Sequence, residues 1–239
     1  MMAMRRIGSR VLGVLLAAVL IAGTFGVALA DGPTGTPLET APPAKEQTTK
    51  RFKATYDDTQ PGADDLRVKE GFAAYQAGDF KKAYDIWLPL AEAGNAEAQF
   101  RIGRLYRRGE GVPEDSSIAA LYWAKASLQY HLSGMQNLGV LYDLGEGVER
   151  NQYKAFELYK YAASHCNVFA QFSLGALYAQ TYTPEQSFPL AYQWLFIAER
   201  YGYQYATSAI NALDKYTIES EKILGQKGMQ EWLANHSCD

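Results

Sequence analysis

The chain has 239 residues, of which 48% are hydrophobic and 21% are charged. This composition is typical of a globular protein, and the length allows one compact domain or one elongated array, which excludes a large multidomain enzyme. The 23 basic and 26 acidic residues give a formal net charge of -3. Because this chain has no basic excess to hold phosphates, we expect no nucleic-acid partner.

The first segment, residues 1–30, has the pattern of a signal peptide. Three arginines between positions 5 and 10 precede an apolar run over 11–22, and Ala28 and Ala30 are the small residues that a signal peptidase needs. We expect cleavage after Ala30, a periplasmic or secreted mature protein, and no membrane insertion after cleavage. The alternative is an uncleaved anchor, since residues 23–30 are also uncharged and would lengthen the apolar run.

Residues 31–64 form a linker rich in Pro and Thr, with few large apolar side chains to offset the entropy of ordering. From Leu66 onward, apolar residues recur at the three- and four-residue spacing of helices. The sequence therefore predicts a helical domain over 65–216. A last element over 217–239, with Thr217 as the N-cap of its helix, is expected to cover the end of that domain.

Internal repetition is the strongest signal in the chain. Residues 102–112 return as 138–148 and, in a shorter form, as 174–178, with a shift of 36 residues each time. The same period relates three further sets of positions: helix N-cap residues, small residues and large residues. These are Asp79, Asp115, Asn151 and Ser187; Ala83, Ala119, Ala155 and Ala191; and Trp87, Trp123, Tyr159 and Leu195.

Each repeat has the pattern of helix A, a Gly-containing turn and a capped helix B. One such hairpin cannot cover its own apolar face, so the hairpins must stack. We expect an all-α fold, an α-solenoid of antiparallel helix pairs followed by one more helix and a C-terminal capping helix. The predicted pairs are 66–93, 95–130, 132–165 and 167–202, and the helix after them spans 204–216.

Several linked motifs resemble the Sel-1-like repeat, a relative of the tetratricopeptide repeat. The motifs in the first full repeat are Ala98-Gln99, Ile102-Gly103, Leu105-Tyr106 and Gly109-Glu110-Gly111-Val112. The Gly-x-Gly-Val turn is replaced over 181–184, which leaves the number of repeats open. The resemblance implies a right-handed superhelix in an exported bacterial protein that binds proteins or peptides, in some relatives as a regulator of an envelope sensor.

A partner is expected on the concave face, which the A helices of such a stack line. The outward stripe in the first full repeat is Glu97, Arg101, Arg104 and Arg108, and in the next two it is Ser133, Asn137, Val140 and Leu144, then Phe169, Ser173, Ala176 and Gln180. The arginines favour an acidic or carboxylate-bearing peptide. The alternative is a solvated face whose arginines only aid solubility.

Three classes of function stay open. The first is a protein-binding adaptor in the bacterial envelope, the second a structural subunit of an envelope assembly, and the third a hydrolase of β-lactams, as described for some relatives. The chain has no Ser-x-x-Lys, Gly-x-Ser-x-Gly or Lys-Thr-Gly motif. We therefore expect no catalytic residues, no enzyme activity and no cofactor.

Two cysteines, Cys166 and Cys238, favour a disulfide in an exported protein. Stacking geometry argues against it, since the final helix is expected about 20 Å from Cys166 if layers are about 10 Å apart. Free thiols and an intermolecular link through Cys238 are the alternatives. A zinc site with His165 and His236 is conceivable, but helix-end solvated histidines are the expectation for these and for His131, and we expect no metal.

Overall fold

The structure, a computed structural model, describes residues 62–63, 65–180 and 186–238, and helices are the regular secondary structure of these ranges. The predicted signal peptide with its cleavage site at Ala30, and nearly all of the predicted linker, lie outside the described residues. The helices are α2 (Leu66–Gln76), α3 (Phe80–Glu92), α4 (Ala96–Arg108), α5 (Ser116–Ser127), α6 (Leu132–Leu144), α7 (Gln152–Ser164), α8 (Val168–Tyr178), α9 (Phe188–Arg200), α10 (Ala206–Leu213) and α11 (Glu219–Asn235).

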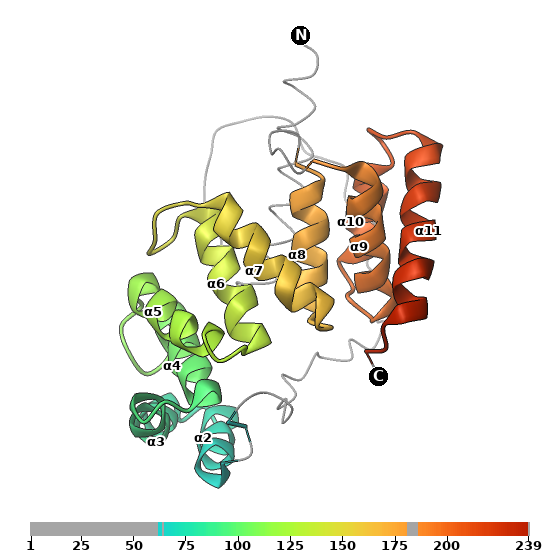
Figure 1. The fold of residues 1–239 in the computed structure, drawn as a ribbon. Coiled ribbons are helices and arrows are strands. Elements are labelled where there is room, and N and C mark those ends of the chain that lie inside the picture. Colours follow the sequence, from blue (N-terminus) through green and yellow to red (C-terminus); the bar gives the residue numbers. More distant parts are fainter. Residues whose placement is uncertain (1–61, 64, 181–185, 239) are drawn as a thin grey trace, which may run out of the picture.

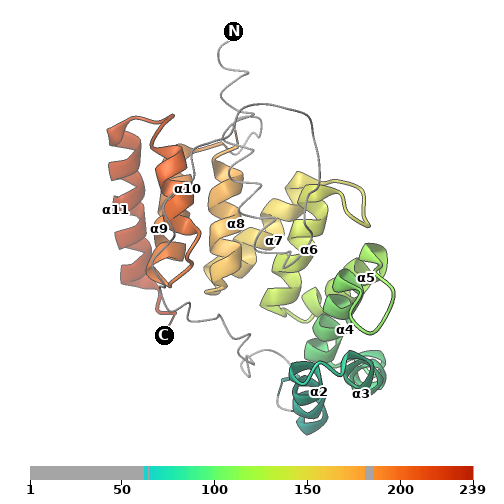
Figure 2. The same cartoon turned by 180° about the vertical axis from the view of Figure 1, so that it is seen from behind.

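The helices follow one another as hairpins in a single curved row, with α2 and α3 at one end and α11 at the other (Figure 1). The view from behind shows the same order (Figure 2). Each helix packs on the next from α2 to α9, and both α10 and α11 pack on α9. The predicted α-solenoid and its four helix pairs are thus confirmed. Within the described ranges, no helix is long and apolar enough to cross a bilayer.

Capping side chains fix where the B helices begin. The four predicted N-cap residues, Asp79, Asp115, Asn151 and Ser187, each accept a hydrogen bond from the backbone N–H three residues further on. The prediction for the last helix is wrong. Ile218 occupies the N-cap of α11, and the hydroxyl of Thr217 instead donates to the carbonyl oxygen of Leu213 at 3.1 Å and lies 2.6 Å from the Tyr192 hydroxyl.

A glycine of each A helix lies against the large residue of its own B helix. A Cβ added to Gly103 would lie 2.6 Å from the Trp123 ring, and one added to Gly139 would lie 2.6 Å from Cε1 of Tyr159. Real Cβ atoms do not approach so closely, so the glycines set the distance between paired helices. The periodic Gly and the periodic large residue are therefore two halves of one contact.

Replacing Gly139 with Val should lower the free energy of unfolding by about 1 to 3 kcal/mol, because the added side chain overfills the contact with Tyr159. Valine is the better helix former, so helix propensity would change stability in the opposite direction. Urea denaturation followed by circular dichroism measures the change. Ser133→Val, at a partly exposed position of the same helix, is the control and should change stability by less than about 0.5 kcal/mol. An unchanged Gly139→Val midpoint would contradict this packing.

The Gly-Glu-Gly turns bind each repeat to the one before it. Tyr75 of α2 donates a hydrogen bond of 2.7 Å to Oε2 of Glu110, and Arg107 of α4 pairs with Glu146. The second glycine permits this approach: Gly147 has φ 70°, and a Cβ there would lie 2.3 Å from the backbone carbon of Ser116. The Glu of each turn is therefore a junction residue rather than a solvated loop residue.

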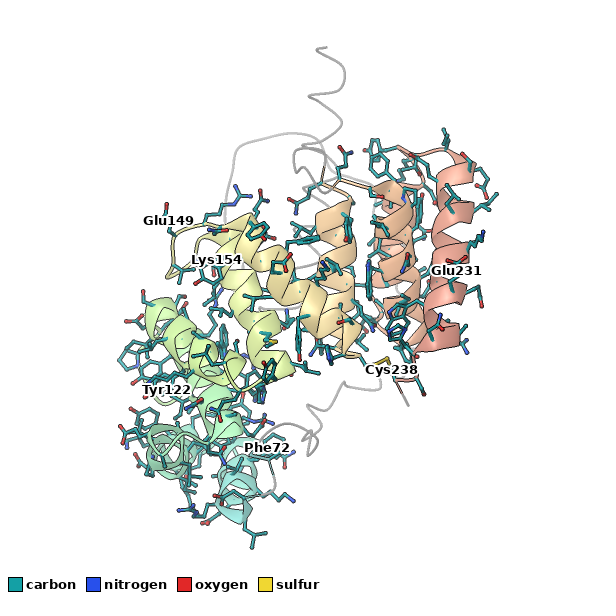
Figure 3. All side chains as sticks on the ribbon, viewed as in Figure 1. Phe72, Tyr122, Glu149, Lys154, Glu231 and Cys238 are labelled. Atoms are coloured by element: carbon teal, nitrogen blue, oxygen red, sulfur yellow. A yellow bond between two sulfur atoms is a disulfide. The ribbon has the colours of Figure 1, made fainter. Side chains whose placement is uncertain are left out.

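The C-terminal helix α11 lies along α9, and the backbone then turns back to the α7–α8 turn. Trp232 packs edge-on against Trp194, with ring centroids 5.8 Å apart. The tail brings Cys238 to Cys166, and the two form a disulfide with a Cα–Cα distance of 5.4 Å (Figure 3). The expected separation of about 20 Å is wrong, because α11 packs on α9 and its tail turns back along the row.

Candidate partner-binding face

The first correction to the predicted face concerns Glu97 and Arg101, which are buried. Their side chains are 1% and 4% exposed, so neither lies on the surface that a partner would meet. The guanidinium of Arg101 lies 4.8 Å from the ring centroid of Phe72, which α2 contributes (Figure 3). The stripe was predicted from α4 alone, and α2 covers the first half of that stripe.

Glu97, Arg101 and His131 form a buried charged cluster between two repeats. Glu97 pairs with Arg101 through Oε1, and its Oε2 lies 2.7 Å from Nε2 of His131. Nδ1 of His131 accepts a hydrogen bond of 3.0 Å from the backbone N–H of Gly134, so Nε2 carries the proton and donates to Glu97. The His131 ring also stacks on Phe100, with centroids 4.7 Å apart.

Electrostatics favours the ionised form of Glu97 despite its burial. Desolvation alone would raise the pKa of this carboxyl group. The hydrogen bond from His131 and the charge of Arg101 outweigh desolvation and hold the pKa below its ordinary value. The cluster therefore contains a carboxylate and a guanidinium that neutralise each other, and its role is to join the repeats.

Arg104 and Arg108 are the predicted residues of α4 that stay accessible. Arg104 is partly exposed, and its guanidinium lies 4.3 Å from the centroid of the Tyr75 ring. Arg108 is 42% exposed; its Nη1 lies 3.4 Å from the Tyr75 hydroxyl and 3.6 Å from Oε1 of Glu110. The accessible cationic part of the predicted stripe is thus confined to the C-terminal half of α4.

The equivalent positions on α6 and α8 are mostly neutral. Asn137 and Val140 are partly exposed, and Nδ2 of Asn137 donates to the carbonyl oxygen of Ser133 at 2.8 Å. Phe169 is 38% exposed and packs edge-on against Tyr203. Ser173 is only 6% exposed, so its prediction as a contact residue is wrong. The reason is that α8 is packed between α7 and α9.

His131 is the structural residue that the sequence reasoning missed. It was expected at a solvated helix end, yet its side chain is fully buried and caps α6. The signal was present in the period of 36 residues, because His131 falls between Asn95 and Asn167, which cap α4 and α8 in the same way. Extending the series of cap residues to the A helices would have identified it.

The described ranges contain no group of three or more His, Cys, Asp or Glu side chains that could hold a metal ion. His165 and His236 lie near the disulfide, but the sulfur atoms of Cys166 and Cys238 are bonded to each other and are not thiolate ligands. The ring of His236 stacks on Trp232, with centroids 4.5 Å apart. The two cysteines therefore attach the C-terminal tail, and the two histidines pack on aromatic rings of their own helices, His165 on Tyr161 and His236 on Trp232.

Stacked antiparallel hairpins with one period define an α-solenoid repeat protein, a class whose extended surfaces bind other proteins. Three hairpins match the family model described as Sel1 repeat, over residues 96–131, 132–165 and 168–200. Residues 96–200 of the protein thus contain three Sel1 repeats. The α2–α3 hairpin and the α10–α11 segment flank the matched residues.

Known proteins show the same relationship. The chain is 34% identical to human "Protein sel-1 homolog 2" over 33% of its own length, and 27% identical to "Chitin synthase regulator SKT5" of Saccharomyces cerevisiae over 52%. It spans only 12% and 18% of the lengths of these two relatives. A Sel1 repeat protein from Oxalobacter formigenes has the same fold, with a TM-score of 0.57 and 24% identity over 70% of this chain and 74% of that chain.

Proposed function

We propose that the protein is a non-enzymatic adaptor of the bacterial envelope that binds a protein or peptide on its A helices. The observation that carries the proposal is the continuous stack of Sel1 repeats, a fold typical of protein-interaction scaffolds. Its A helices present partly exposed side chains at equivalent positions, among them Arg104, Asn137 and Val140. Such a row supports contact with an extended segment.

The periplasm, or the secreted state, is the proposed location. Two independent features support it: the signal-peptide pattern of residues 1–30 and the pairing of Cys166 with Cys238. Disulfides persist in oxidising compartments and are rare where thiols are kept reduced. The disulfide also attaches α11 to the rest of the stack. This attachment lasts only in a compartment that does not reduce disulfides.

Regulation of an envelope sensor is the proposed role of the adaptor. The yeast relative is named as a regulator of chitin synthase, and its similarity to this chain extends over 128 residues. The second candidate is a structural subunit of an envelope assembly. The Pro- and Thr-rich composition of residues 31–64 supports this candidate, because a linker of that composition would act as a spacer between the repeats and the rest of an assembly.

Affinity capture distinguishes these roles. The mature protein, residues 31–239, is immobilised and exposed to a bacterial envelope fraction, with excess free mature protein as competitor in the control. We expect specific capture of one sensor or regulator, released by the competitor. A stoichiometric set of complex subunits would instead support the structural role. If no protein is released by the competitor, or if the pure protein hydrolyses a chromogenic β-lactam, the adaptor proposal fails.

A further inference from the structure

We infer that Tyr75, Arg104 and Arg108 form a binding site for a single peptide carboxylate, at the junction of α2 and α4. This inference rests on the proposed function for the kind of partner, a protein or peptide. It adds the chemical group that is recognised and the residues that recognise it. The carboxylate can come from an Asp or Glu side chain or from the C-terminal end of the bound peptide.

Tyr75 provides a fixed platform for the site. Its hydroxyl donates to Glu110, and its ring packs against Phe80 and Trp87, with centroids 5.1 and 6.0 Å away. The Arg104 guanidinium lies on the same ring at 4.3 Å. A guanidinium that stacks on a held aromatic ring keeps its N–H groups oriented, so less entropy is lost when a carboxylate binds.

Arg104 is the cation of this group that lacks a carboxylate partner. Arg101 is neutralised by Glu97, and Arg108 faces Glu110 at 3.6 Å. No carboxylate of the described residues forms an ion pair with Arg104. Desolvation and the neighbouring charges of Arg101 and Arg108 lower the pKa of Arg104, as expected for a cation among cations. The group therefore carries about one unit of excess positive charge at a partly buried position.

The charge balance favours a carboxylate over a more highly charged anion. Oε1 of Glu110 lies 3.6 Å from Nη1 of Arg108, so a dianion at the site would also meet this carboxylate. A single carboxylate matches the excess charge and can accept two parallel N–H donors from the Arg104 guanidinium. The site is thus suited to one acidic group rather than to a phosphate or a polyanion.

The neighbouring surface is suited to the uncharged part of a peptide. Val140 and Asn137 occupy on α6 the positions that Arg104 and Arg101 occupy on α4, and both are partly exposed. A bound segment that places its carboxylate on Arg104 would continue over these neutral side chains. We therefore expect one acidic position in the ligand, next to residues that tolerate apolar or amide contacts.

Selection from a random decapeptide library with free C-termini tests the site without a known ligand. The bait is the mature, disulfide-bonded protein. We expect enrichment of Asp or Glu at one position, or a dependence on the free C-terminus. An enriched peptide is then resynthesised with Asn or Gln in place of the acid, or with an amidated end, to identify which carboxylate binds. Loss of that carboxylate should weaken binding about tenfold or more.

Two arginine variants and one control locate the site. Arg104→Gln should lower the affinity for the enriched peptide about tenfold. Arg108→Gln should lower this affinity less, because Arg108 also faces Glu110. Lys125→Gln is the matched control: Lys125 also lies over a tyrosine ring, at 5.1 Å from the Tyr122 centroid, but on α5. It should leave affinity unchanged. Thermal unfolding of each variant checks that the stack is intact.

Three results would overturn the site: no enriched peptides, equal binding of the carboxylate-free peptides, or equal affinity for the wild type and folded Arg104→Gln. The envelope capture experiment distinguishes failure of the carboxylate site from failure of the proposed function. If the captured partner still binds Arg104→Gln, the adaptor stands and the site is wrong. If acidic peptides need Arg104 but the envelope yields no specific partner, the site stands and the proposed function is wrong.

Discussion

Removing the Cys166–Cys238 disulfide should lower the free energy of unfolding by about 4 kcal/mol. The two residues are 72 positions apart in the sequence. On the chain-entropy model, closing a loop of this length lowers the conformational entropy of the unfolded chain and so raises its free energy by about 4 kcal/mol. Urea denaturation of the oxidised protein, residues 31–239, with and without a reducing agent, measures the difference.

The Cys166→Ser, Cys238→Ser double variant is the control for this experiment. It should be as unstable as the reduced wild type and should not respond to the reducing agent. Two reactive thiols in the native monomer would show that the bridge does not form. A reducible dimer that disappears in Cys238→Ser would show that the cysteine links two molecules instead.

The second large effect is expected from Glu97→Ala, which should lower the free energy of unfolding by about 3 to 5 kcal/mol. The change leaves Arg101 buried without its carboxylate and removes the acceptor of His131. Urea denaturation at neutral pH measures the loss. Glu92→Ala, at an exposed glutamate near the end of α3, should change stability by less than about 0.5 kcal/mol. Equal stability of the two variants would contradict the role of the cluster.

The contribution of Glu97 to the free energy of unfolding should fall as the pH is lowered. A carboxyl group whose pKa is lowered in the folded state stabilises the protein above its unfolded-state pKa, and this stabilisation is lost as the pH falls through the folded-state pKa. The pKa of Glu97 is lowered by His131 and Arg101. The stability difference between the wild type and Glu97→Gln should therefore be constant near neutral pH and narrow below about pH 4.

The fold could be predicted because each contact between paired helices recurs, with similar residue types, in successive repeats of the sequence. Gly139 and Tyr159 are each one member of a periodic series, and their spacing places them on facing helices of one hairpin. The direction of α11 could not be predicted in this way. It depends on the packing of Trp232 against Trp194, a contact that occurs once and has no period.

The candidate site was predicted in part, for a related reason. A helical stripe identifies which residues of α4 share a face, and Arg104 and Arg108 were correctly placed on an accessible surface. It does not tell how far the preceding hairpin extends over that face. Burial of Arg101 follows from Phe72 of α2, and the burial of His131 goes with its contact to Glu97 of the preceding repeat. Both are contacts between repeats, which the pattern of one helix does not contain.

The turn glutamates have a consequence for the order of the repeats. Glu110 meets a tyrosine of the preceding A helix and Glu146 meets an arginine, so the two junctions use different chemistry. In the sequence, the residue 36 positions after Glu146 is a tyrosine, Tyr182. Excision of one 36-residue unit between Arg107 and Leu144 would put Glu146 in the place of Glu110, opposite Tyr75, and would thereby take from Arg107 its carboxylate partner. The Tyr75 junction would accept either unit, whereas the Arg107 junction would lose its ion pair, so the repeat units are not fully interchangeable.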